Sequence, residues 1–325
     1  MALSRWNSYN VNKYTLLALS ILLLASHSAS RAVEPGQKPI MRTIKVGELN
    51  RAYCLHVPLN LPKDKAVPLV LLFHGGGGTP AQIDKETKFG EAATRQGFLV
   101  ACPDGVRKRW NDGRDAGNVP AQRYNINDLA FVEAVLNDVA GNYKLDQKRV
   151  FATGISNGAI FSQYLAVKLS SRIAAIAPVA GGLPDTLSAD FNPEKPVAVL
   201  MFNGTDDSFV PYTGGKITVF RMKNRGAVIS TNGTVQKWIG RDGCNSEPIT
   251  EEMPDTDPGD GCRVKKFTYA KGKDGTEVAL YQIEGGGHTW PGVTPTLPKF
   301  IVGKVCRDIN ATAIILEFFK AHPKP

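Results

Sequence analysis

The residues with the clearest chemical potential lie in the pattern Gly-x-Ser-x-Gly, formed by Gly154, Ser156 and Gly158. An apolar stretch of strand length, 150–153, comes before the serine, and an apolar run with helical spacing, 159–169, follows it. A serine on a sharp strand-to-helix turn is the arrangement of a nucleophile elbow, in which glycines let the chain pass close by. The start of the helix also directs backbone N–H groups toward negative charge. The pattern therefore predicts that Ser156 is a nucleophile.

A serine nucleophile needs a general base, and the chain has five histidines. Four of them are poor candidates, because they lie in the N-terminal segment, in an expected strand, directly before a glycine run or close to the C-terminus: His27, His56, His74 and His322. His288 alone lies in a glycine-rich loop after a late apolar strand, from which a base could reach the serine. We therefore expect His288 to be the base.

A carboxylate should hold the imidazole of this base in the correct tautomer. Asp206 and Asp207 follow the apolar run 197–202, which lies between the serine and the histidine in the chain. The residues alone leave both carboxylates open, and both could instead form a turn. The order serine, aspartate, histidine along the chain is the order of α/β-hydrolases.

A run of four glycines follows His74 and the apolar stretch 69–73. In an esterase, backbone N–H groups of such a run would bind the oxyanion together with the N–H of Asn157, the residue after the nucleophile. A phosphate-binding loop is the alternative. Neither GxxxxGK[ST] nor a complete GxGxxG with its acidic partner is present, so the run favours an oxyanion hole.

The elements that must position these groups alternate between strands and helices. We expect strands at 69–73, 98–102, 150–153, 173–179, 197–202 and 277–283, and helices at 82–96, 127–143, 159–169, 231–239 and 311–320. A hairpin is expected at 43–57 and loops at 110–124 and 244–262. Near-continuous apolar strands between helices imply a mostly parallel sheet with helices on both faces. Residues 33–325 are expected to form one such α/β domain.

Composition and charge exclude several classes of protein. The chain has 325 residues, 42% of them hydrophobic and 21% charged, which is typical of a globular protein. Its net charge of +9 is scattered and accompanies no nucleic-acid-binding module. Residues 1–32 combine a positive start, a short apolar run and small residues, which predicts a signal peptide. We therefore expect a secreted protein, extracellular or periplasmic, without a stable membrane anchor.

The five cysteines are expected to serve structure rather than chemistry. Cys244 and Cys262 flank a stretch rich in proline, aspartate and glycine, and we expect them to form a disulfide after export. Cys54 and Cys102 lie in apolar strand-like runs and are expected to be buried thiols. The spacings do not resemble a zinc site, and the odd count, which includes Cys306, leaves at least one thiol free.

Six motifs stand in order along the chain, and together they carry a family resemblance. They are HGGGG at 74–78, PDG at 103–105, WNDG at 110–113, GISNG at 154–158, GTDDSFVPY at 204–212 and GGHTWPG at 286–292. Residues 40–320 thereby resemble the secreted esterases grouped with polyhydroxybutyrate depolymerases and family 1 carbohydrate esterases, which include feruloyl esterases. The resemblance implies an α/β-hydrolase fold and a serine esterase without a metal or an organic cofactor.

The resemblance also implies roles for individual residues. Ser156 would be the nucleophile and His288 the base, and the family pattern Gly-Thr-x-Asp-x-x-Val-Pro-Tyr selects Asp207 over Asp206. Two backbone N–H groups would form the oxyanion hole, for which the first choices are Gly76 and Asn157 and the next is Gly77.

The substrate is expected to be an ester of plant polysaccharide, feruloyl or acetyl. A polyhydroxyalkanoate or its oligomers come second, and a non-catalytic binding protein with the same fold is the alternative from another class. Trp110 and Trp290 either line the acyl pocket or belong to the core.

Overall fold

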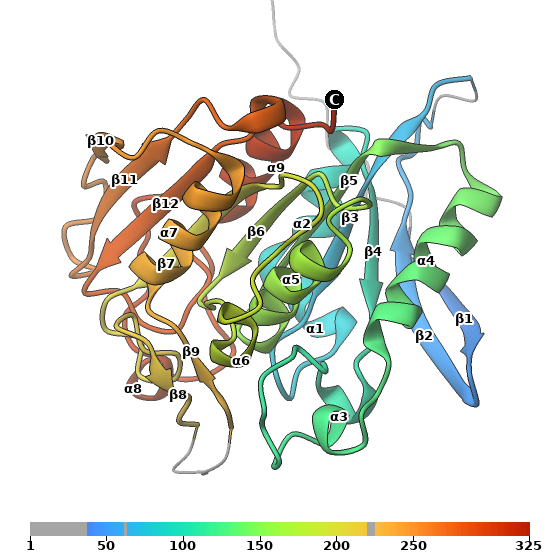
Figure 1. Cartoon of the computed structure of the whole chain (residues 1–325), viewed down its shortest axis with the longest axis horizontal. Helices are drawn as coiled ribbons and strands as arrows, with labels where there is room; N and C mark the ends of the chain where they lie inside the picture. The colour runs from blue at the N-terminus through green and yellow to red at the C-terminus, as the bar shows by residue number, and fades with distance from the viewer. Residues whose placement is uncertain (1–37, 62–63, 220–224) are drawn as a thin grey trace, which may run out of the picture. The chain divides into compact units, whose positions relative to one another are not determined.

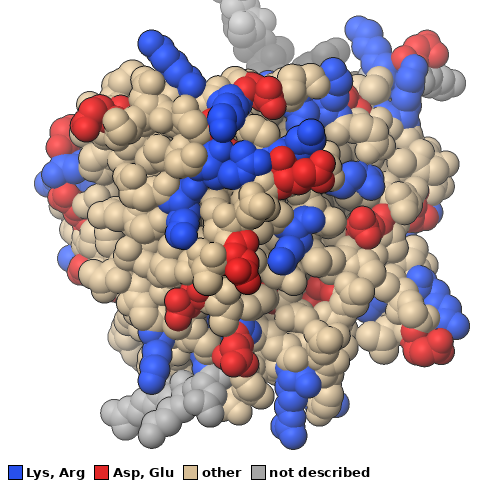
Figure 2. All heavy atoms as spheres, in the orientation of Figure 1, with Lys and Arg blue, Asp and Glu red and all other residues tan. Residues whose placement is uncertain are grey.

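The computed structural model describes residues 38–61, 64–219 and 225–325. These described residues form one compact unit. The predicted signal peptide, residues 1–32, lies outside the described residues. Among the described residues, no helix has the length and apolar character needed to cross a bilayer. In the face drawn in Figure 2, basic and acidic side chains are interspersed.

A ten-stranded sheet organises this unit, and its six central strands are parallel. The strand order in space is β1 (Ile40–Val46), β2 (Leu49–His56), β4 (Leu99–Pro103), β3 (Val67–Phe73), β5 (Leu145–Ile155), β6 (Ala175–Val179), β7 (Ala198–Gly204), β12 (Val278–Glu284), β11 (Arg263–Tyr269) and β10 (Ile249–Glu252). The two strands at each edge are antiparallel to their neighbours. A separate ribbon pairs β8 (Gly215–Lys216) with β9 (Ala227–Val228).

Helices cover both faces of the sheet (Figure 1). One apolar core forms beneath α4 (Asp128–Asn142), α5 (Asn157–Lys168) and α7 (Thr231–Asp242), and the other beneath α1 (Pro80–Thr87), α2 (Phe89–Arg95) and α9 (Ala311–Ala321). Alternate side chains of β3 enter opposite cores, Leu71 the first and Leu72 the second. Successive side chains of a strand point to opposite faces, so a strand buried on both sides is apolar throughout. The predicted α/β-hydrolase architecture is confirmed.

Short helical turns complete the described chain. They are η1 (Val106–Lys108), α3 (Pro120–Arg123), α6 (Asp185–Ser188), η2 (Lys273–Gly275) and α8 (Lys299–Val302). The α3 turn lies inside the stretch 110–124 that the sequence predicted to be a loop.

Two further sequence predictions of secondary structure are wrong. The expected helix at 82–96 is two helices, because Lys88 adopts a left-handed conformation with φ 50° and ends α1. The expected loop at 244–262 contains the strand β10. The strand β11 follows this stretch, and no strand was predicted there. All four residues of β10 are exposed, and Glu251 pairs with Lys266 of β11. A polar edge strand of this kind carries no apolar alternation by which it could be recognised.

Candidate active site

Ser156 occupies the turn between β5 and α5, where its backbone has φ 59° and ψ −121°. Such a conformation is unfavourable for a residue with a side chain and persists only where the surroundings enforce it. The N–H of Ser156 donates to the carbonyl oxygen of Val179 at 3.0 Å. The flanking glycines are required by close packing, since a Cβ atom would lie 2.4 Å from the carbonyl oxygen of Phe73 at Gly154 and 2.3 Å from it at Gly158.

The imidazole of His288 is held by Asp207. His288 follows β12, Asp207 follows β7, and Nδ1 of the histidine lies 2.7 Å from Oδ2 of the aspartate. The other carboxylate oxygen accepts hydrogen bonds from the N–H groups of Phe209 at 2.8 Å and Val210 at 2.9 Å. Both members of the pair are buried. Both carboxylate oxygens are therefore engaged, and the carboxylate fixes the ring, which leaves Nε2 as the nitrogen not engaged by Asp207.

Asp206 takes no part in this arrangement. Its side chain is exposed and accepts a hydrogen bond from the hydroxyl of Thr205 at 3.2 Å. Its N–H donates to the carbonyl oxygen of Gly286, so the residue shapes the turn before the histidine loop. Of the two adjacent carboxylates, only Asp207 contacts His288.

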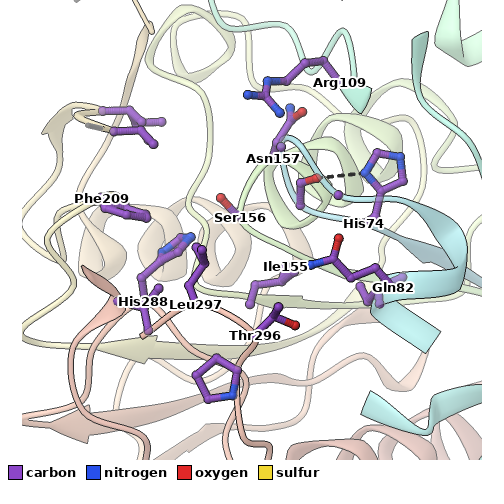
Figure 3. A pocket seen from close by; sticks show the side chains of 18 of the residues that line it. His74, Gln82, Arg109, Ile155, Ser156, Asn157, Phe209, His288, Thr296 and Leu297 are labelled. Carbon is purple, nitrogen blue, oxygen red and sulfur yellow. Dashed lines mark hydrogen bonds between the residues drawn. The ribbon is translucent and has the colours of Figure 1, made fainter. Parts of the chain in front are cut away.

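Ser156 and His288 line the same cavity, on neighbouring parts of its wall (Figure 3). Within the part of the chain that the structure describes, the hydroxyl of Ser156 has no hydrogen-bond partner. Hydrogen bonds between nucleophile and base are often long in the absence of substrate and tighten when a substrate binds. The shared cavity is thus compatible with proton transfer from the hydroxyl to the imidazole.

The backbone N–H groups of the glycine run after β3 differ in whether they already have a hydrogen-bond acceptor. The N–H of Gly77 donates to the carbonyl oxygen of Lys108 at 2.9 Å, and that of Gly78 donates to Gly75 at 3.0 Å. Among the described residues, the N–H of Gly76 has no acceptor. Asn157 is the first residue of α5, where an N–H has no acceptor within the helix. Gly76 and Asn157 therefore offer available donors beside Ser156, and Gly77 does not.

The side chain of Asn157 fixes the loop that begins at Trp110. Its Oδ1 accepts from the N–H of Trp110 at 2.9 Å, and its Nδ2 donates to Oδ2 of Asp112 at 2.6 Å. Asp112 in turn pairs with Arg114 at 2.7 Å, and both side chains are buried. Sequence reasoning assigned Asn157 only a backbone role and missed this buried network, whose members lie about 45 residues apart in the chain.

Neither tryptophan is among the residues that line the cavity, so of the two alternatives that the sequence left open, the acyl pocket is not supported. Trp110 is fully buried, its ring stacks on Phe161 with centroids 5.2 Å apart, and its Nε1 donates to the carbonyl oxygen of His74 at 2.9 Å. Trp290 is also buried, and its Nε1 donates to Thr312 at 3.1 Å. Both indoles bury a large apolar surface and satisfy their single donor inside the protein, so both are core residues.

The predicted disulfide between Cys244 and Cys262 is absent, since both thiols are free in the structure. The two cysteines have different neighbours: Cys244 packs against Gly272, whereas Cys262 lies in a group with Asp260 and Cys306 whose ligand atoms are within 4.8 Å of one another. Spacing along the chain did not reveal this neighbour. A second such group consists of Cys54, His56 and Cys102. Neither group lines the cavity beside Ser156.

The cavity has a volume of about 180 Å³ and two kinds of wall. Apolar side chains form most of one part: Ile83, Ile155, Phe209, Ile217, Val219, Leu297 and Val302. Phe209 packs on the imidazole of His288, with ring centroids 5.0 Å apart. Three arginines, Arg109, Arg114 and Arg225, form another part. Sequence reasoning missed these cavity residues, although Arg109 directly precedes one of the quoted motifs and Phe209 lies inside another.

Comparison with known proteins gives a consistent set of relatives. Residues 51–187 match the family model described as "Esterase PHB depolymerase". A putative esterase, NocK of Nocardia uniformis subsp. tsuyamanensis, is 28% identical over 85% of this chain and 81% of its own length. Feruloyl esterase B of Piromyces equi is 29% identical over 73% of this chain, but the match spans only 42% of that enzyme. Probable feruloyl esterase C of Aspergillus niger is 24% identical over 85% of this chain and 95% of its own.

Solved structures agree in fold. The acetyl xylan esterase from Aspergillus awamori aligns with a TM-score of 0.50 at 16% identity, over 77% of this chain and 94% of its own. The structure titled sOPH native aligns with a TM-score of 0.53 at 17% identity, over 89% of each chain.

Proposed function

We propose that this carboxylic ester hydrolase, which matches the group of polyhydroxybutyrate depolymerases and feruloyl esterases, cleaves its substrates with Ser156, His288 and Asp207. The observation that carries the proposal is the 2.7 Å contact between Nδ1 of His288 and Oδ2 of Asp207, next to a strained serine in one cavity. A nucleophile, a base and a group that orients the base are the parts that acyl transfer requires.

In the first half of the reaction, the hydroxyl oxygen of Ser156 attacks the ester carbonyl carbon while Nε2 of His288 accepts the hydroxyl proton. Asp207 keeps the proton on Nδ1 and stabilises the imidazolium that forms. The tetrahedral intermediate collapses, the bond to the alcohol oxygen breaks, and His288 returns the proton to the leaving alcohol. Water then attacks the acyl-enzyme by the same sequence and releases the acid.

The oxyanion of the tetrahedral intermediate would accept hydrogen bonds from the N–H groups of Gly76 and Asn157. This choice is supported by the engagement of Gly77 with the carbonyl oxygen of Lys108, which removes the competing donor. Donors that are already in position when charge develops need no reorganisation during the reaction. The start of α5 adds the positive end of its dipole at the same place.

Labelling with a fluorophosphonate tests this proposal directly. Such a reagent reacts with a serine that an adjacent base activates. We expect one covalent adduct, located by peptide mass spectrometry on Ser156, and no adduct after prior treatment with denaturant. A non-catalytic binding protein with this fold would remain unlabelled, and that result would overturn the proposal.

For the substrate we propose feruloyl or acetyl esters of plant polysaccharide, supported by relatives that are named feruloyl esterases along most of this chain. Hydroxyalkanoate polymers or oligomers are the second candidate, supported by the family match over residues 51–187. Rates on methyl ferulate, acetylated xylan and hydroxybutyrate oligomers separate the two. Turnover of the oligomers alone would reject the first candidate.

We also propose that the protein is exported, on the basis of the signal-like sequence of residues 1–32. The expected result is a mature chain that begins near residue 31 or 33 and is recovered outside the cytoplasm. N-terminal sequencing of the recovered protein measures this, and a mature chain that retains Met1 would contradict export by cleavage.

A further inference from the structure

The guanidinium of Arg109 lies against the glycine run beside the proposed nucleophile. A Cβ atom at Gly76 would be 3.0 Å from its Nη1, and one at Gly77 would be 3.1 Å from the same nitrogen. A Cβ atom at Gly75, in the same run, would be 3.5 Å from Cβ of Ser156. The glycine run thus lies next to both the guanidinium of Arg109 and the side chain of Ser156. Figure 3 shows it at the end of the cavity beyond Asn157, away from His288.

Arg109 has no acidic partner among the described residues. No carboxylate of that part of the chain lies within 4.0 Å of its guanidinium, and Nη1 donates to the carbonyl oxygen of Lys108 at 3.0 Å. The neighbouring Arg114 is different, because its guanidinium pairs with the buried carboxylate of Asp112. A guanidinium presents five donors in a rigid fork that matches a carboxylate. Arg109 therefore lines the cavity without a carboxylate partner among the described residues.

The charges around the cavity reinforce this picture. Arg109, Arg114 and Arg225 line it, and Glu86 is the one carboxylate in its wall among the described residues. Glu86 already contacts the hydroxyl of Thr296 and the amide of Gln82. Burial, followed by the charges of Arg225 and Arg114, lowers the pKa of Arg109. An arginine still remains protonated at neutral pH, so the cavity carries an excess of positive charge.

We propose that Arg109 binds a carboxylate that the ester substrate carries in addition to its ester group. The site would hold the anion in a bidentate pair at the end of the cavity opposite to His288, while the ester carbonyl lies at Ser156. Esters that contain a free acid fit this site: half-esters of diacids on the acyl side, and esters of hydroxy acids on the alcohol side. The inference rests on the proposed function, since it assigns a specificity residue to that same site.

This substrate class bears on the two candidates above. An oligomer of hydroxyalkanoate ends in a free carboxylate, whereas an acetyl or feruloyl group on a neutral sugar provides none. Arg109 would therefore favour esters that carry a free acid, whichever of the two substrate classes is correct. Short hydroxyalkanoate oligomers already contain the carboxylate that the site requires.

Two matched pairs of esters test the inference. Mono-p-nitrophenyl adipate and p-nitrophenyl hexanoate share a leaving group and an acyl length, and differ in an acyl-side carboxylate. Meta-acetoxybenzoate and its amide differ in an alcohol-side carboxylate. We expect kcat/KM to favour the anionic member of at least one pair, and the pair that responds identifies the side on which the carboxylate lies.

The variant Arg109→Gln should reduce this preference by about 10- to 100-fold, the range expected when a hydrogen-bonded charge pair is removed. Arg109→Lys should retain part of the preference, because it keeps the charge without the fork. Arg107→Gln is the matched control: this exposed arginine lies in the same loop and should leave the ratio within about twofold. Raised salt should also weaken the wild-type preference, because it screens charges that solvent reaches.

The outcomes separate the inference from the proposed function. Equal losses on both members of a pair in Arg109→Gln would mean that Arg109 only supports the glycine run, and would overturn the inference. An absence of preference in the wild type would overturn it as well, even if the variant did not fold. Turnover that persists in Ser156→Ala would instead reject the proposed function. Loss of turnover in Ser156→Ala with an unchanged ratio in Arg109→Gln rejects the inference alone.

Discussion

Two regions of the molecule each bring together a nucleophile, an imidazole and a carboxylate. One is the cavity in which Ser156 lies beside the His288–Asp207 pair. The other is a thiol cluster between the sheet and α1, which we define as Cys54, His56, Cys102 and Asp84. In the thiol cluster, Cys54 of β2 lies directly opposite Cys102 of β4. The ingredients of covalent catalysis are thus present twice.

Electrostatics in the thiol cluster would even favour a reactive sulfur. Hydrogen bonding to Cys102 lowers the pKa of the Cys54 thiol; burial opposes this shift, and the contact with His56 adds to it. Burial lowers the pKa of His56, but the Asp84 carboxylate, 3.1 Å from Nε2, and the neighbouring Cys54 outweigh burial and raise it to about 9. Perturbed groups of this kind are usually sought as markers of functional sites.

The two regions differ in access and backbone geometry. Cys54 is 4% exposed within a regular strand, and Cys102 is fully buried. Ser156 instead sits on a turn with φ 59°, at a helix N-terminus, next to a free N–H and an open cavity. We infer that access and backbone geometry, rather than residue types and shifted pKa values, distinguish the proposed active site from the thiol cluster. A substrate must be able to reach the nucleophile, and hydrogen-bond donors must already be in position where the oxyanion forms.

The strongest test of this contrast is Ser156→Ala against Cys54→Ser. We expect Ser156→Ala to lower kcat on p-nitrophenyl acetate by about 10⁴-fold or more, because the covalent route is lost. Cys54→Ser should keep kcat/KM within about twofold, because no substrate reaches the thiol cluster. Circular dichroism should show both variants folded. A large loss of activity in a folded Cys54→Ser variant would contradict the claim that only the Ser156 region takes part in catalysis.

A second test uses the two adjacent aspartates. Asp207→Asn should lower kcat by about 10³- to 10⁴-fold, because an amide would hold His288 in the wrong tautomer. Asp206→Asn is the control and should stay within about threefold, since among the described residues its exposed side chain accepts a hydrogen bond from Thr205 and makes none to His288. Stopped assays over a range of pH measure both variants. The reverse order of the two effects would reassign the carboxylate that orients the base.

A third test asks whether the thiol cluster serves stability. His56→Gln removes an imidazole whose Nε2 lies 3.1 Å from Oδ2 of Asp84. We expect a loss of about 2 kcal/mol in the free energy of unfolding, as for removal of one partner of a buried polar contact. Esterase activity per folded molecule should not change. Urea titration and active-site titration with fluorophosphonate give the two quantities, and an unchanged stability would contradict a structural role.

A fourth and smaller effect concerns Asp242, a buried carboxylate that lacks the partners of Asp207. Its Oδ1 accepts from the N–H of Val197 at 3.4 Å, and Oδ2 has no hydrogen-bond partner among the described residues. Burial raises the pKa of Asp242 to about 7, against the weaker opposing effect of that hydrogen bond. The protonated carboxyl group therefore stabilises the fold fully at pH values below 3.8, the pKa that Asp242 has in the unfolded chain. This contribution is lost as the pH rises through 7, the pKa in the folded protein.

Asp242→Asn cannot ionise and should escape that loss. The free energy of unfolding of the variant minus that of the wild type should therefore be about 1–2 kcal/mol larger at pH 8 than at pH 4. This is a conservative fraction of the full effect of the pKa shift, for which each pKa unit corresponds to about 1.4 kcal/mol. Urea titrations at both pH values measure the difference. A difference that is the same at pH 4 and pH 8 would show that Asp242 does not titrate in this window.

Much of this protein was readable from short stretches of sequence. The pattern around Ser156 predicted a strand, a sharp turn and a helix, and β5 and α5 follow that order. Apolar runs predicted the central strands, because a strand buried on both faces tolerates few polar residues. His288 emerged by elimination among five histidines. These inferences depend on neighbours along the chain, which the sequence lists directly.

The remaining choices depend on contacts between distant segments. Gly77 is removed as an oxyanion donor by Lys108, about 30 residues away, and the side-chain surroundings of Trp110 and Trp290 bury both indoles. Arg109 lies in the cavity wall and against the glycine run, although the two are distant in the chain. The sequence supplied the chemical groups and their local geometry. Tertiary packing decided which of them share a cavity, because burial and hydrogen-bond partners are set by segments that meet only in the folded chain.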